Sequence, residues 1–309
     1  MISSFLNVGS QVVVLFILIG VGVVLTKLKI LSQSGVSSIT NLILYVVSPC
    51  LIINAFLREY DSAMMKSLLT ALIASIGIMT LSVVIAKLLF GKVDENRGVI
   101  LKFAVVFSNC GFMSIPLQQA LLGDEGVFYG AVFLAVFNFF MWSYGLITMS
   151  GEKKPKMMIK ALVNPGIIGT IIGVVLFAFS IRPPQVVTSA VDYLASMNTA
   201  LPMIVIGYYL ATSNLKRAFS SVLSYIAMAL RLVVIPLLTM IVLFLLKVDK
   251  VLLCAIVISV SSPVATFTTM FSAKYGRDTE LSVGIVAATA LLSMITIPLV
   301  VGLTQYITM

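Results

Sequence analysis

Two short stretches of the sequence concentrate polar and helix-disfavouring residues inside otherwise apolar segments. The first, "SNCGFMSIPL", starts at Ser108 and includes Asn109 and Pro116; the second, "SVSSPVATFTT", starts at Ser259 and includes Pro263. A proline within a helix removes a backbone donor and clashes with the preceding turn. The N-termini of the half-helices that result carry partial positive charge and suit an anion. These residue types therefore indicate binding through amides and hydroxyls rather than bond-breaking chemistry.

The composition shows what surrounds these stretches. Of the 309 residues, 60% are hydrophobic and only 10% are charged, and the mean hydropathy is +1.15. Soluble domains carry roughly 25% charged residues. At about 20 residues per membrane crossing, apolar segments fill almost the whole chain. The sequence therefore predicts an all-α integral membrane protein, whose first segment is a retained span rather than a signal peptide.

Several function classes are excluded by the residues that the chain lacks. It has no histidine, its three cysteines stand alone, and all eleven acidic residues fall in or beside the expected loops. We therefore expect no enzyme activity, no cofactor and no metal centre built on histidine or cysteine. The net charge of +9 is explained by basic cytoplasmic loops, so no nucleic-acid partner is expected.

Hydrophobic runs separated by charged residues predict ten transmembrane helices. They cover residues 11–28, 36–57, 66–90, 98–122, 126–149, 161–181, 186–212, 221–246, 250–274 and 280–305. Fourteen of the 20 lysines and arginines fall on one side of these spans, five fall on the other, and Arg231 falls within a span. Because basic residues favour the cytoplasmic side, both termini are expected outside, in a multi-pass protein of the plasma (inner) membrane.

Matching residues at a nearly constant offset indicate an internal repeat. Pro202 follows Pro49 by 153 residues, Gly276 follows Gly123 by 153, and "AIVISVSSP" follows "AVVFSNCGF" by 151. The sequence thus predicts two five-helix repeats, residues 1–149 and 161–309, joined by a cytoplasmic linker at 150–160. A unit with an odd number of spans enters the membrane from opposite sides when repeated, so the two repeats are inverted, as in many secondary transporters.

Two polar side chains at membrane depth leave alternatives open. Arg231 lies about ten residues into the eighth span, where it could pair with an anionic substrate, hydrogen-bond helix carbonyls or extend to the interface. Asn138 in the fifth span could hydrogen-bond a neighbouring helix or line the cavity. Glycines such as Gly20, Gly22 and Gly166 are expected to let helices approach closely.

At this point the sequence resembles a known family. "SNCGFMSIPLQQALLGDEGV" and "FSAKYGRDTELSVGIVAATALLSMITIPL" look like the two crossover segments of the auxin efflux carrier family, which includes plant PIN carriers and bacterial permeases. Asn109 matches the crossover asparagine of the family, Pro116 its first crossover proline and Pro263 the second. The plant carriers have glutamine where Val264 stands, and a long cytoplasmic loop where this chain has only residues 150–160.

The resemblance implies an architecture and a mechanism. It implies two proline-broken crossover helices at the substrate site and a scaffold of spans 1, 2, 6 and 7, through which the family forms homodimers. Spans 3–5 and 8–10 would then move as an elevator-like transport unit. Short bacterial members are linked to small carboxylates such as malate or malonate, and the plant members to auxin-like acids.

The leading hypothesis is therefore a secondary transporter of a small organic anion. The expected substrate-binding residues come from the two crossovers and two further spans: Asn109, Cys110, Gly111, Phe112, Met113, Pro116, Asn138, Arg231, Ser261, Ser262, Pro263, Val264 and Thr266. A sodium-coupled symporter stays open, because hydroxyls near Ser261 and Thr266 could bind Na⁺. A channel, or a sensor that binds without transporting, is the alternative from another class.

Overall fold

The computed structural model describes residues 2–58, 62–151, 164–213 and 218–308, and every element in these ranges is helical. The helices of the first half are α1 (Ile2–Lys27), α2 (Gln33–Leu42), η1 (Ile43–Val47), α3 (Ser48–Phe56), α4 (Ser62–Phe90), α5 (Glu95–Val106), η2 (Cys110–Ser114), α6 (Ile115–Phe140), η3 (Met141–Gly145) and α7 (Leu146–Ser150). Those of the second half are α9 (Pro165–Ala178), α10 (Gln185–Thr212), α12 (Val222–Ala229), η4 (Leu230–Val234), α13 (Ile235–Leu245), α14 (Lys250–Ser261), α15 (Phe267–Lys274) and α16 (Thr279–Thr308). The predicted all-α class is confirmed.

Three of the four π-helical segments directly precede a proline. Pro49, Pro116 and Pro236 each occupy the second position of the helix that follows η1, η2 and η4. A π-turn is one residue wider than an α-turn, which relieves the clash of the proline ring with the preceding turn. The helices therefore continue past these prolines, whereas Pro202 and Pro298 lie inside the regular helices α10 and α16.

Seven helical segments of the described chain are long and apolar enough to cross a membrane. One of them, Cys110–Ser150, has 41 residues and contains Gly123, whose φ of 65° and ψ of −157° break the helix. Two shorter apolar helices coincide with predicted spans. Pro165–Ala178 lies in the span predicted at 161–181, whose first residues are not described, and Lys250–Ser261 is the part of the span predicted at 250–274 that precedes the interruption. The chain is therefore a multi-pass membrane protein, while ten spans remain a prediction.

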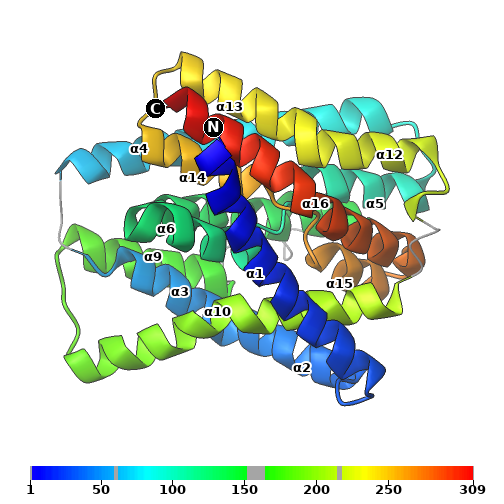
Figure 1. Cartoon of the computed structure of the whole chain (residues 1–309), viewed down its shortest axis with the longest axis horizontal. Helices are drawn as coiled ribbons and strands as arrows, with labels where there is room; N and C mark the ends of the chain where they lie inside the picture. The colour runs from blue at the N-terminus through cyan, green and yellow to red at the C-terminus, as the bar shows by residue number, and fades with distance from the viewer. Residues whose placement is uncertain (1, 59–61, 152–163, 214–217, 309) are drawn as a thin grey trace.

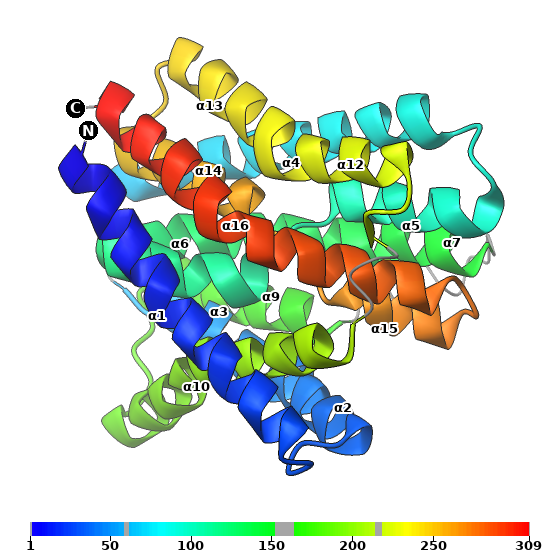
Figure 2. The same cartoon turned by 45° about the vertical axis from the view of Figure 1, so that its right-hand side comes forward.

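The helices form two groups that meet along the middle of the molecule. Helices α2, α3, α9 and α10 lie together in the lower part of Figure 1, with α1 crossing in front of them, while α4, α5, α12, α13, α14 and α16 lie above. α1 packs against both α10 and α16, and α6 packs against α14 and α9, so both helices touch both groups. The two chain ends lie close together at one end of the molecule in both views (Figures 1 and 2).

Two turns lie at matching positions of the two halves. Gly123 and Gly276, 153 residues apart, both have positive φ, 65° and 62°. Glycine adopts this conformation without the penalty that a Cβ brings. A glycine with positive φ thus follows each interruption. The linker predicted at 150–160 lies outside the described residues beyond Gly151.

Helices α1 and α10 cross through a pair of glycines. A Cβ on Gly22 would lie 2.3 Å from the carbonyl oxygen of Ile204, and one on Gly207 would lie 2.2 Å from that of Ile19. Small residues at such a crossing allow two backbones to touch inside a membrane. Gly20, expected from the sequence to act in the same way, would meet nothing within 4 Å.

We expect Gly22→Ala to destabilise the protein by about 1–3 kcal/mol, because the added methyl group overlaps a backbone carbonyl that cannot rotate away. Gly20→Ala is the matched control, since the same change two residues earlier enters open space. The measurement is the thermal unfolding midpoint of the two purified variants in detergent. Equal midpoints for the two variants would show that the α1–α10 crossing tolerates a wider spacing.

Candidate functional site

The two interrupted helices meet and pair through their backbones. Helix α5 ends at Val106 and helix α14 at Ser261, and each is followed by a short extended stretch. The backbone N–H of Asn109 donates to the carbonyl oxygen of Pro263 at 2.7 Å, and that of Ala265 donates to Phe107 at 3.0 Å. An antiparallel β-bridge between Ser108 and Val264 results. The freed backbone groups of one interruption thus satisfy those of the other, as burial at membrane depth demands.

The extended part of the first interruption is shorter than the sequence suggested. It covers residues 107–109 only, and the chain returns to a helix as the π-turn η2 (Cys110–Ser114) before Pro116. Pro116 therefore lies at the start of α6 rather than at the point where the helix breaks.

Arg231 lies against the C-terminal ends of both interrupted helices. Its side chain is 1% exposed. Nη1 donates to the carbonyl oxygens of Val105 at 3.0 Å and Val106 at 3.3 Å, and Nη2 donates to that of Val260. No carboxylate pairs with it among the described residues. Of the alternatives left open by the sequence, the structure shows the contact with helix carbonyls, which is the usual way for a cation to satisfy a helix C-terminus.

A small cavity of about 30 Å³ lies beside the crossing. It is bounded on one side by Ser108, Asn109 and Gly111, and on the other by η1, α3 and the first residues of α9. Five aromatic side chains complete its wall: Tyr45, Phe112, Phe137, Trp142 and Phe267. Such a volume holds about one or two water molecules. The space at the crossing is therefore smaller than a carboxylate substrate.

Two asparagine side chains in this cavity have no hydrogen-bond partner among the described residues. Asn109 is 3% exposed and Asn138 is 9% exposed, and both line the cavity. Buried amides are almost always hydrogen-bonded in native proteins. Their unpaired donors are thus available to a ligand, and the cavity-lining alternative for Asn138 is the one that its geometry favours.

The other residues predicted in the first crossover divide into two sets. Gly111 and Phe112 line the cavity, and the aromatic ring of Phe112 lies 5.8 Å from that of Phe267. Cys110 and Met113 are fully buried and point into the packed core. Their side chains do not border the cavity, because successive residues of a helical turn face different directions.

In the second crossover, the predicted residues Ser261, Ser262, Pro263, Val264 and Thr266 are buried but do not border the cavity. The Ser262 hydroxyl donates back to the Ile258 carbonyl at 3.3 Å, and the Thr289 hydroxyl accepts from the Val264 N–H at 3.2 Å. The hydroxyls of Ser261 and Thr266, together with those of Thr268 and Thr269, are buried without a partner among the described residues. Ser261 and Thr266 are the residues whose hydroxyls the sequence left open as ligands for Na⁺.

Three polar residues that sequence reasoning did not select are part of this region. Asn198 of α10 donates from Nδ2 to the carbonyl oxygen of Gly111 at 2.8 Å and so ties the lower helix group to η2. Gln118 of α6 donates to the carbonyl oxygen of Ala255 at 2.8 Å and to the hydroxyl of Ser259 at 2.9 Å. Asn164, at the start of α9, lines the cavity. Asn198 and Gln118 carried a usable signal, since each is a polar side chain inside an apolar segment.

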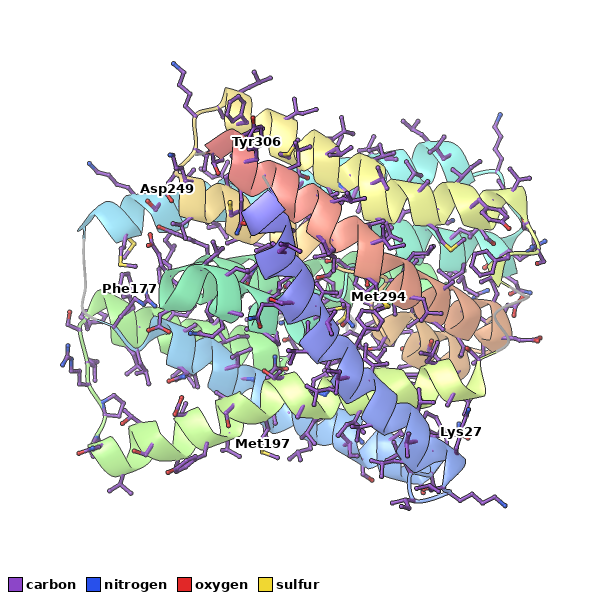
Figure 3. The ribbon with its side chains drawn as sticks, viewed as in Figure 1. Lys27, Phe177, Met197, Asp249, Met294 and Tyr306 are labelled. Atoms are coloured by element: carbon purple, nitrogen blue, oxygen red, sulfur yellow. The ribbon has the colours of Figure 1, made fainter. Side chains whose placement is uncertain are left out.

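The molecule differs at its two ends. A vestibule of about 520 Å³ opens between α2, α10, α15 and α16, lined by polar residues such as Gln33, Tyr209 and Thr269. It lies towards the end of the molecule that carries Lys27 in Figure 3. At the opposite end, where Figure 3 labels Phe177, aromatic rings pack together: the ring of Phe128 lies 5.1 Å from that of Phe56 and 5.4 Å from that of Phe177. A hollow of about 590 Å³, lined by residues such as Leu57 and Gln185, opens at the surface beside this packing.

This aromatic end is tied together by an arginine. The guanidinium of Arg58 lies 5.0 Å from the ring centre of Phe128, and its Nη2 donates to the carbonyl oxygen of Asp124 at 2.8 Å. The position of the cation over the aromatic face and the backbone hydrogen bond both stabilise the packing around Phe128. The aromatic packing at this end is therefore reinforced by Arg58.

An all-helical membrane protein with an amide-bearing cavity at the meeting point of two interrupted helices has the architecture of a secondary transporter. The chain belongs to the membrane transport protein family, which includes the auxin efflux carriers: the family model described as "Membrane transport protein" matches residues 8–301. A search of curated proteins gave no match. The resemblance expected from the two crossover motifs is thereby confirmed, and the family is one of transporters rather than enzymes.

Proposed function

We propose that the chain is a secondary carrier of a small organic anion, with its substrate site at the crossing of the two interrupted helices. The observation that carries this proposal is the position of Arg231, whose guanidinium donates to carbonyl oxygens at the C-terminal ends of both α5 and α14. A helix C-terminus carries about half a negative charge. Two of them meeting at one point would repel an anion, and the single positive charge of Arg231 offsets both.

With the C-terminal ends neutralised, the N-terminal ends of the following helices determine the sign of the local potential. The chain resumes as η2 and α6 after the first interruption and as α15 after the second. Each of these N-termini carries about half a positive charge. No acidic residue lies among the residues that line the cavity. The resulting potential suits a carboxylate.

The side chains of the cavity suit both parts of such a substrate. Asn109 and Asn138 offer unpaired amide donors for the carboxylate oxygens, and the aromatic wall offers an apolar surface for the rest of the molecule. Malate, malonate and an auxin-like acid are the candidates. Because the cavity is lined from both helix groups, a displacement of one group against the other would enlarge it enough to admit them.

The proposed mechanism is alternating access of the elevator type. The scaffold would consist of spans 1, 2, 6 and 7 (α1, α2–α3, α9 and α10), and the remaining spans, in the described structure α4–α7 and α12–α16, would form the transport unit. The packing of α1 against α10 and of α3 against α9 supports this division. The proposal also includes ten spans in two inverted repeats and a homodimer formed through the scaffold. It places the protein in the plasma membrane with both termini outside. The vestibule would then open to the cytoplasm.

Sodium coupling is a second candidate, and the unpaired hydroxyls of Ser261, Thr266, Thr268 and Thr269 favour it. Hydroxyl and carbonyl oxygens are suitable ligands for a hard cation. However, the carbonyl of Val260, next to Ser261, already accepts from Arg231. A fixed positive charge at that distance disfavours a second cation.

The test is uptake of radiolabelled malate, malonate and indole-3-acetate into proteoliposomes, with and without a sodium gradient and a pH gradient. We expect saturable uptake of at least one carboxylate that is accelerated when the same carboxylate is loaded inside. A flux without saturation or counter-flow would indicate a channel. Transport of a cation or a neutral solute, with none of the acids moving, would contradict the electrostatic argument. A requirement for sodium would select the second candidate.

A further inference from the structure

The first turn of α9 faces the cavity from the side opposite to Asn109. Its N-cap is Asn164, whose side-chain oxygen accepts from the backbone N–H of Ile167 at 3.0 Å. Pro165, at the first helical position, has no N–H to offer. Because the first N–H groups of a helix have no partner within it, the N–H of Gly166 is left as the donor of this turn. Asn164, Pro165 and Gly166 all border the cavity.

Gly166 brings the amide of Asn138 onto this helix end. A Cβ at position 166 would lie 2.3 Å from Nδ2 of Asn138 and 3.2 Å from the side-chain oxygen of Asn164. Only a residue without a side chain leaves that space. Asn138 is more than nine-tenths buried and makes no hydrogen bond among the described residues. The amide of Asn138 and the first N–H groups of α9 form two neighbouring sets of donors, which is the arrangement that holds an oxyanion.

We infer that Asn138, Gly166 and the N-terminus of α9 form a second anion subsite, at the place where α6 of the transport unit meets α9 of the scaffold. This inference rests on the proposed function and extends it, because it assigns part of the substrate contact to helix α9. The carboxylate is held between Asn109 or Asn138 of one helix group and the α9 turn of the other. Displacement of the transport unit removes the α9 contact, so the subsite contributes affinity in only one of the two transport states.

The experiment uses the full-length protein in proteoliposomes, with malonate and indole-3-acetate as probes. Asn164→Asp keeps an N-cap of equal quality and adds a negative charge at the subsite. We expect the KM for the transported acid to rise at least about tenfold, equivalent to about 1.4 kcal/mol of binding free energy. Ser32→Asp is the matched control: Ser32 caps α2 through the N–H of Gly35, away from the cavity, and the same new charge there should leave KM unchanged.

A second variant separates the subsite from helix capping. Gly166→Ala keeps Asn164 in place and adds one methyl group, which must displace the Asn138 amide. We expect its KM to rise as well, with an unfolding midpoint close to that of the wild type. If the wild-type protein carries one of the acids but a folded Asn164→Asp or Gly166→Ala variant has an unchanged KM, the subsite is overturned. The proposed function is unaffected by that result. A wild-type protein that carries neither of these acids nor malate overturns both.

Discussion

Asn109→Ala is expected to reduce carboxylate uptake by about 10- to 100-fold while the protein keeps its thermal stability. A hydrogen bond to a charged group contributes about 1.5–3 kcal/mol, and the side-chain amide of Asn109 has no partner within the described chain to lose. The link between the two interruptions uses the backbone N–H of Asn109, which donates to Pro263 and is retained in alanine. Initial uptake rates in proteoliposomes and the unfolding midpoint in detergent are the two measurements.

Asn54→Ala is the control for this substitution. Asn54 of α3 also carries a side-chain amide on a helix, but it donates to Asp192 at 3.1 Å, away from the cavity. The control should transport at the wild-type rate. Normal uptake by Asn109→Ala would show that the crossover amide does not contact the substrate. A parallel loss of stability would show instead that the side chain has a structural role.

Arg231→Met is expected to lower the free energy of unfolding by about 3–5 kcal/mol, which is the usual cost of removing one partner from a buried charged arrangement. The carbonyl oxygens of Val105, Val106 and Val260 would lose their donor, and the negative ends of α5 and α14 would face each other without a cation. Arg231→Lys should be intermediate, because an ammonium keeps the charge but cannot span carbonyls on two helices as a guanidinium does. The unfolding midpoints and the yield of monodisperse protein measure the order of stability among wild type, Arg231→Lys and Arg231→Met.

The same pair of variants separates the two roles considered for this arginine. If Arg231 orders the crossing, stability and transport decline together from arginine to lysine to methionine. If it instead binds the substrate directly, Arg231→Met keeps the wild-type midpoint and loses transport only. A methionine variant with both properties intact would mean that other groups satisfy the two helix ends, and the electrostatic basis of the proposed function would then have to be abandoned.

Only some of the residues that the sequence predicted for the site border the cavity. Asn109, Gly111 and Phe112 were selected from one short motif, and all three line the cavity. Cys110 and Met113 belong to the same motif but face the packed core. A motif states which backbone segment is irregular, and it does not state which way each side chain of a helical turn points, because that depends on the rotation of the turn against its neighbours.

The residues missed by the sequence prediction lie far from the motifs in the chain. Asn198 meets Gly111 across 87 residues, and Asn164 reaches the cavity from the start of α9. Asn164 looks from the sequence like an ordinary helix N-cap preceding a proline, which is a common way to begin a helix. Its helix end faces the site only because α9 packs against α3 and α6.

The amino-acid sequence by itself determined the membrane class, the helical architecture and the location of both interruptions, because bilayer thickness and the chemistry of proline act locally along the chain. It also left Arg231 with three alternatives, since a cation at membrane depth is satisfied by a substrate, by carbonyls or by the interface. Only the tertiary structure showed which carbonyls it contacts, by bringing the ends of α5 and α14 to the same guanidinium. Long-range pairing of backbone groups depends on how the helices cross, and no local pattern specifies that crossing.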